Sequence, residues 1–185
     1  YILHFRHAEK EKWIDVEKYD SLESDVHMNG KNGTRYAEDD YFSKAVCLNS
    51  RGKVQARAIG EHLENISFPI GYIISSPSCR ARQTSALAFG KYSRLDRNLV
   101  HAGPYTEEIG KRTKILRNLY LGLPILEGKN TIVSAHNGVI MPQMFDNSDS
   151  IPKMIELEEG GFYVISAKNG KLFLEHEFDH FRSFI

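Results

Sequence analysis

The chain has 185 residues, 41% of them hydrophobic, so it is long enough to bury a substantial core, and one domain over residues 1–185 is expected. Lys plus Arg and Asp plus Glu each number 24, and this zero net charge argues against a nucleic-acid or anionic-membrane ligand. No apolar run approaches the roughly 20 residues of a membrane-spanning helix, so we expect a soluble chain without a membrane span.

A buried strand is predicted at the start of the chain. Residues 1–5 form a short, β-rich apolar run that leads directly into Arg6 and His7. A polar stretch follows, from about 9 to 49, in which Asn-Gly pairs predict turns and scattered aromatic residues favour an ordered segment. Because loops this long in compact domains are usually functional or disordered, we expect an insertion that forms a lid or specificity loop.

A helix and a second buried strand are predicted next. The helix begins at Ser50, which is expected to be its N-cap. Its apolar face is predicted to consist of Val54, Ala58, Ile59, Leu63 and Ile66. The strand covers residues 71–76 and leads toward Arg80.

The segment 78–89 is predicted to be a helix that ends at Gly90, a residue suited to the left-handed conformation. Its N-terminus points free N–H groups at the end of the preceding strand, which favours an anion there. A weak strand at 99–100 and a helix from Pro104 to about Leu121 follow.

The last third of the chain combines a strand, a helix and a hairpin. The strand at 131–135 leads into His136, and a helix is expected over 139–145. Residues 161–167 and 171–177 flank an Asn-Gly pair, which is a strong hairpin signal. The alternation of strands and helices predicts an α/β fold: a three-layer α/β/α sandwich with a mostly parallel central sheet and a C-terminal β-hairpin.

Three strands therefore end at cationic or titratable side chains. In open α/β sheets, ligands bind beyond the carboxyl ends of the strands, so Arg6, His7, Arg80 and His136 are expected to share one pocket. Guanidinium groups hold phosphoryl oxygens through a rigid fork of donors, and a neutral imidazole can attack phosphorus. Nearby arginines would depress the pKa of the attacking imidazole. The pattern predicts chemistry on a phosphomonoester.

The two cysteines are too few for a disulfide framework, and their spacing fits no zinc site, so Cys47 and Cys79 are expected to be free thiols. Cys79 is considered as a nucleophile and disfavoured.

The first residue is Tyr, so a segment upstream is expected to be missing; the compartment is left open, with a cytoplasmic location slightly favoured. His4 is interpreted as a packed core residue, and Arg82 as surface or salt-bridged.

Four blocks of sequence, in order, resemble the histidine phosphatase superfamily, also called phosphoglycerate mutase-like. They are LHFRHAE at 3–9, LNSRGKVQA at 48–56, SSPSCRARQT at 75–84 and VSAHNG at 133–138. The resemblance implies that His7 is the nucleophile that becomes phosphorylated, and that Arg6, Arg80 and His136 bind the phosphate. It also implies a parallel α/β/α domain without a metal or organic cofactor.

The general acid is where the chain departs from the family. In the acid phosphatase branch an Asp directly follows the second His, but Asn137 stands there and cannot donate a carboxylic proton. The other branch places a Glu after the third strand, which points to Glu107, with Glu108 as second choice. Glu9 and Asp15 are further alternatives.

The expected activity is hydrolysis of a phosphomonoester, on a phosphorylated small molecule or a phosphoprotein, through a phosphohistidine intermediate. Two alternatives stay open: a phosphomutase of the same superfamily, and a phosphate-binding module without catalysis. The substrate and the oligomeric state are left open by the sequence.

Overall fold

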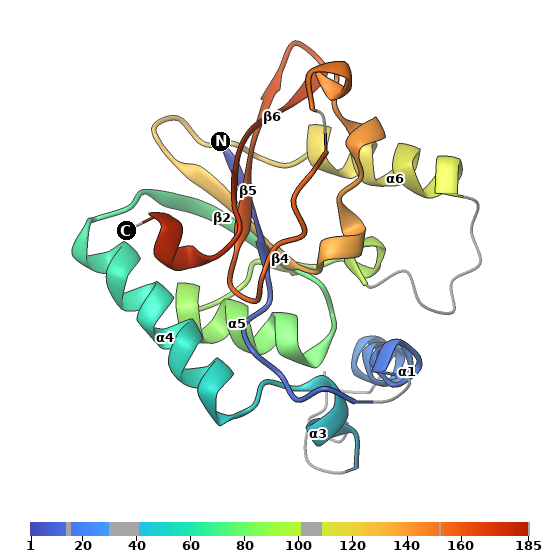
Figure 1. Cartoon of the computed structure of the whole chain (residues 1–185), viewed down its shortest axis with the longest axis vertical. Helices are drawn as coiled ribbons and strands as arrows, with labels where there is room; N and C mark the ends of the chain where they lie inside the picture. The colour runs from blue at the N-terminus through green and yellow to red at the C-terminus, as the bar shows by residue number, and fades with distance from the viewer. Residues whose placement is uncertain (14–15, 30–40, 101–108, 152, 185) are drawn as a thin grey trace.

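A computed structural model describes residues 1–13, 16–29, 41–100, 109–151 and 153–184 of the chain. Its centre is a six-stranded sheet with the strand order β3-β2-β4-β1-β5-β6 (Figure 1). The strands are β1 Ile2–Arg6, β2 Ile70–Ser75, β3 Arg94–Leu95, β4 Asn130–Ala135, β5 Phe162–Lys168 and β6 Lys171–Phe178.

Four strands of the sheet run parallel. The pairs β3–β2, β2–β4 and β4–β1 are all parallel, whereas β5 lies antiparallel to β1 and β6 antiparallel to β5. The turn between β5 and β6 has positive φ angles at Asn169 (53°) and Gly170 (72°), as the Asn-Gly pair predicts. The predicted mostly parallel sheet and C-terminal hairpin are therefore confirmed.

Helices cover both faces of the sheet, which gives the three predicted layers (Figure 1). On one face, Ile74 and Val133 pack with Leu116 and Tyr120 of α6. On the other face, apolar residues of the same strands pack with α4 and α5. Successive strand residues point to opposite faces, so each buried strand contributes to both cores. The helices are α1 Val16–Asn29, α3 Tyr41–Val46, α4 Ser50–Asn65, α5 Cys79–Phe89 and α6 Ile109–Leu121.

The beginning of α4 differs by one residue from the prediction. Asn49, not Ser50, is the N-cap, and its Oδ1 accepts a hydrogen bond from the N–H of Gly52 at 2.7 Å. A side chain at position 52 would collide with the carbonyl oxygen of Glu9, so glycine permits α4 to approach the segment after β1. The buried face of α4 is also rotated from the prediction, and consists of Gly52, Ala56, Ile59 and Leu63.

Two other predicted elements were wrong in type. Leu99 ends the 3₁₀ helix η1 Arg97–Leu99, and the short strand is β3, before it. Where a helix was expected over 139–145, the chain forms η2 Asn137–Val139 and η3 Pro142–Met144, because Pro142 cannot continue a helix through that segment. Two further 3₁₀ helices are η4 Ser148–Ser150 and η5 Phe181–Phe184. No helix within the described ranges is long and apolar enough to cross a membrane.

The insertion after β1 contains two helices in its described part, α1 and α3. They contact each other and the α5 helix, near the end of α5 that begins at Cys79 (Figure 1). The insertion therefore lies beside the carboxyl end of the parallel strands, where the candidate site is expected.

Candidate active site

The polar residues that follow β1, β2 and β4 lie side by side because the hydrogen-bond pattern of the sheet continues beyond the strands. The N–H of His7 donates to the carbonyl of Ala135 at 3.0 Å, and the N–H of Ser76 donates to Ser134 at 2.8 Å. The carbonyl of His7 in turn accepts from Gly160 at 3.1 Å. This places His7 and His136 together at the carboxyl end of the sheet, with ring centroids 5.3 Å apart and planes at 63°.

The His7 imidazole is buried and its tautomer is determined by one contact. Its Nδ1 lies 2.8 Å from the carbonyl oxygen of Ala8, which can only accept, so Nδ1 carries the proton and Nε2 keeps its lone pair. Burial lowers the pKa of His7 well below its usual value, and the charges of Arg80 and Arg6 lower it further. The imidazole is therefore neutral, with Nε2 suited to attack an electrophile.

His136 is held by groups from three other parts of the fold. Its Nε2 lies 3.1 Å from Ser76 Oγ and 4.0 Å from Asp20 Oδ2. Its carbonyl oxygen lies 3.1 Å from His4 Nε2, and the other His4 nitrogen lies 2.6 Å from the Tyr120 hydroxyl. His4 is thus the packed, hydrogen-bonded residue that was predicted. Burial lowers the pKa of His4 to about 4, so it stays neutral while it positions the backbone of His136.

Arg6, the last residue of β1, is half-buried. Its backbone N–H donates to Gly161 at 2.9 Å, and its guanidinium donates to the carbonyl of Leu157. The same carbonyl accepts from Asn137 Nδ2 at 2.8 Å. Arg6 and Asn137 therefore both hold the carbonyl of Leu157. Asn137 occupies the position where the acid phosphatase branch has its Asp, and here it donates a hydrogen bond.

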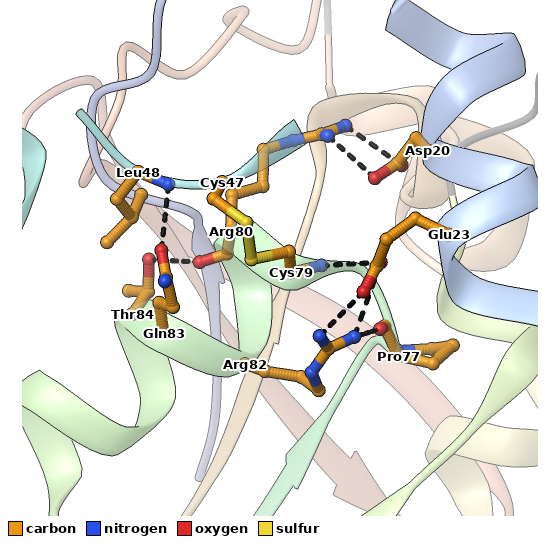
Figure 2. The surroundings of a disulfide bond; sticks show 10 residues. All are labelled: Asp20, Glu23, Cys47, Leu48, Pro77, Cys79, Arg80, Arg82, Gln83 and Thr84. Atoms are coloured by element: carbon orange, nitrogen blue, oxygen red, sulfur yellow. Dashed lines mark hydrogen bonds and ion pairs between the residues drawn. A yellow bond between two sulfur atoms is a disulfide. The ribbon is translucent and has the colours of Figure 1, made fainter. Parts of the chain in front are cut away.

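Arg80 is buried, with 2% of its side chain exposed, and it binds a carboxylate (Figure 2). Its two terminal nitrogens donate to the two oxygens of Asp20 at 2.7 and 3.0 Å, and Asp20 is itself fully buried. Within the described part of the chain, Arg80 Nε has no hydrogen-bond partner. A phosphoryl group that binds the end of this guanidinium must therefore take the place of Asp20.

A second buried ion pair lies next to the first. Arg82 donates to both oxygens of Glu23, at 2.7 and 3.3 Å, and also to the carbonyl of Pro77 (Figure 2). Glu23 also accepts from the N–H of Cys79 at 3.1 Å. Of the two settings predicted for Arg82, the salt bridge is correct and the surface position is wrong. Burial raises the pKa of Glu23, while Arg82 opposes that rise.

Sequence reasoning missed the two carboxylates of α1. Asp20 and Glu23 are three residues apart on a helix, a spacing that places them on one face. That spacing alone gives no sign that this face is buried against Arg80 and Arg82, about 60 residues later.

The expectation of two free thiols is also wrong, because Cys47 and Cys79 form a disulfide (Figure 2). Their Cα atoms are 4.9 Å apart, although 32 residues separate them in sequence. Cys47 follows α3 and Cys79 is the first residue of α5, so the packing of these helices brings the sulfurs together. A disulfide-bonded Cys79 is not available as a nucleophile.

Of the four carboxylates considered as general acid, Glu9 lies within the described residues. Glu107, Glu108 and Asp15 all lie outside the described residues. Glu9 accepts from Asn49 Nδ2 at 2.8 Å and from Arg51, and these contacts lower the pKa of Glu9 and hold it ionised. Glu9 is therefore a poor proton donor.

Glu159 is another carboxyl close enough to Arg6 to be affected by its charge, and sequence reasoning missed it. Burial raises its pKa, against the opposing charge of Arg6. The part of the chain that the structure describes contains no group of three or more His, Cys, Asp or Glu residues that could hold a metal ion.

Comparison with known proteins identifies a family in part of the sequence. A family model for the histidine phosphatase superfamily (branch 1) matches residues 36–99. This range includes the sequence blocks around Gly52 and Arg80, and lies between His7 and His136. A search of curated proteins found no significant match.

Solved structures share the fold over nearly the whole chain. An open reading frame product of Mycobacterium tuberculosis matches with a TM-score of 0.57 and 16% identity, over 97% of this chain and 98% of that chain. Phosphoserine phosphatase of Entamoeba histolytica, solved with 3-phosphoglyceric acid, gives 0.58 and 15%, over 96% and 95%.

The protein histidine phosphatase SixA, solved with tungstate, gives a TM-score of 0.53 and 15% identity, over 96% and 95% of the two chains. At these identities the likeness concerns the fold. The resemblance to the histidine phosphatase superfamily is thus confirmed, by a sequence match over residues 36–99 and by a shared fold over almost the entire chain.

Proposed function

We propose that the protein is a phosphatase that hydrolyses a phosphomonoester through a phosphohistidine intermediate on His7. The observation that carries this proposal is the state of the His7 imidazole, which is neutral, protonated on Nδ1 and placed beside His136 at the end of the sheet. The positive charges of Arg80 and Arg6 act on this imidazole and keep it neutral, which suits a nucleophile.

In the first step, Nε2 of His7 attacks phosphorus, the bond to the leaving oxygen breaks, and a general acid protonates that oxygen. In the second step, water attacks phosphorus, the P–N bond breaks, and inorganic phosphate leaves. Arg6, Arg80 and His136 stabilise the charge on the phosphoryl oxygens throughout, since positioning and electrostatics account for most of the catalysis of phosphoryl transfer.

We assign the general acid to Glu107, with Glu108 as second choice. Glu9 is held ionised by Arg51, and Asn137 has no acidic proton, so both are weaker candidates for this role. The substrate class that fits is a phosphorylated small molecule or a phosphoprotein side chain, and the reaction as written requires no metal or organic cofactor.

The test is to trap the intermediate. A phosphoramidate is labile in acid and stable in base, so labelled substrate is mixed with the enzyme and quenched rapidly in alkali. The wild-type protein should retain label on the chain, and His7→Ala should retain none. Label on the His7→Ala variant would exclude the assignment.

Two further assays separate the alternatives. Release of phosphate from p-nitrophenyl phosphate distinguishes a phosphatase from a binding module that only holds a phosphorylated ligand. Conversion of one phosphoglycerate isomer into another, without release of phosphate, would instead identify a mutase.

A further inference from the structure

The acidic lid, by which we mean α1 together with α3, is attached to α5 at three points that lie within four consecutive residues. Asp20 binds Arg80, Glu23 binds Arg82 and the N–H of Cys79, and the disulfide joins the end of α3 to Cys79 (Figure 2). The part of α5 that presents the phosphate-binding arginine is therefore also the part that holds the lid.

The lid competes with a phosphoryl group for Arg80. Asp20 is bound through both terminal nitrogens of the guanidinium, the same two-pronged arrangement that phosphoryl oxygens adopt. A phosphoryl group cannot use the two N–H groups that Asp20 occupies, and the Asp20 carboxylate repels an anion from the remaining ones, so phosphate binds best to the fraction of molecules in which Asp20 has left. The apparent affinity for phosphate falls by that fraction.

The disulfide keeps the lid where it competes. It joins two helices that contact each other and α1, and its half-cystines are 32 residues apart in sequence. Asp20 and Arg80 belong to one chain, so rebinding is intramolecular in either redox state, but the disulfide shortens the path between them and raises the effective concentration of Asp20 at Arg80. Without the link, the lid would be held by the two ion pairs and its packing alone.

One of the two half-cystines lies at a groove. Cys47 is 5% exposed and lines a groove of about 500 Å³ together with Trp13, Lys44, Lys53 and Gln83, whereas Cys79 is fully buried. Attack on Cys47 expels Cys79, which is the first residue of the 11-residue helix α5. The helix N-terminus favours the departing Cys79 thiolate and the Glu23 carboxylate on the same N–H opposes it, so the groove at Cys47 decides which sulfur is attacked.

From this arrangement we propose that the Cys47–Cys79 disulfide is a redox switch that locks the acidic lid onto Arg80, and that a dithiol reductant releases it. One thiolate of the reductant attacks Cys47 Sγ, and Cys79 leaves as a thiolate. The second thiol of the reductant then displaces Cys47, so the reductant becomes the disulfide and two electrons pass to the protein. The proposal deepens the proposed function, because it concerns access to the same phosphate pocket.

The experiment measures binding of inorganic phosphate by calorimetry, with the full-length protein oxidised or reduced by dithiothreitol. Reduction should lower the Kd about threefold or more, because loss of the disulfide roughly doubles the length of chain that connects Asp20 to Arg80. Cys47→Ser should bind with the reduced value in both conditions. Asp20→Asn keeps the disulfide but removes the competing charge, so it should bind tightly in both conditions.

Equal phosphate affinity of the oxidised, reduced and Cys47→Ser proteins would overturn the switch. A gain in affinity cannot come from unfolding, so loss of the native fold in a variant does not imitate the expected result. Binding does not depend on turnover: a reductant-dependent Kd without phosphatase activity would support the switch and contradict the proposed function. Turnover with a KM that does not respond to reduction would support the proposed function and contradict the switch.

Discussion

Removal of Arg82 tests whether its ion pair with Glu23 is as buried as the structure shows. Arg82→Met keeps much of the side-chain volume but leaves the fully buried Glu23 carboxylate, among the described residues, with the N–H of Cys79 as its remaining hydrogen-bond donor. Breaking one side of a buried ion pair costs about 3–5 kcal/mol, because the remaining charge is uncompensated. The variant should lose this much unfolding free energy at pH 8.

The loss should depend on pH in a definite direction. Burial already raises the pKa of Glu23, and Arg82 is the main group that opposes the rise, so the substitution raises this pKa further. A carboxyl with a raised pKa in the folded state stabilises the fold less as pH increases, by up to about 1.4 kcal/mol per pH unit. The deficit of Arg82→Met should therefore be large at pH 8 and much smaller at pH 5.

Urea unfolding of the wild type and the variant at both pH values measures this deficit. Arg51→Met is the matched control, since the Arg51 side chain is 82% exposed beside Glu9 and its loss should leave the unfolding free energy nearly unchanged at both pH values. Adding Glu23→Gln to Arg82→Met should remove the pH dependence. A deficit that is the same at pH 5 and pH 8 would refute the reasoning.

Three further outcomes are expected. Glu107→Gln should slow hydrolysis of an alkyl phosphate about 10²- to 10⁴-fold but affect p-nitrophenyl phosphate much less, because only the alkoxide needs a proton; equal losses would indicate a structural role. A chelator should leave the rate unchanged, and a loss that added metal restores would contradict the mechanism. An NMR titration should give His4 a pKa of about 4, and a value near 6.5 would show that its imidazole is not buried against Tyr120.

Local signals in the sequence were enough for most of the sheet. The apolar runs that become β1, β2 and β4 are short and bounded by polar residues, and the Asn169-Gly170 pair specifies its hairpin through backbone conformation alone. The convergence of His7 and His136 also followed, because parallel strands end at the same edge of a sheet.

Local signals were weaker where a single residue changes the backbone. Asn49 and Ser50 are both good N-caps, and the hydrogen bond to Gly52 decided between them. After β4, apolar spacing suggested a helix, but Pro142 divides the segment into 3₁₀ turns.

The lid and its attachments were decided by the tertiary structure alone. Asp20 and Arg80 are 60 residues apart, and Cys47 and Cys79 are 32 apart, so no local pattern links them. Whether a carboxylate on a polar helix meets solvent or a buried arginine depends on which surface that helix packs against. Here α1 and α3 pack on the start of α5. This packing buries Asp20 and Glu23, places Asp20 against Arg80 and brings the two cysteines together.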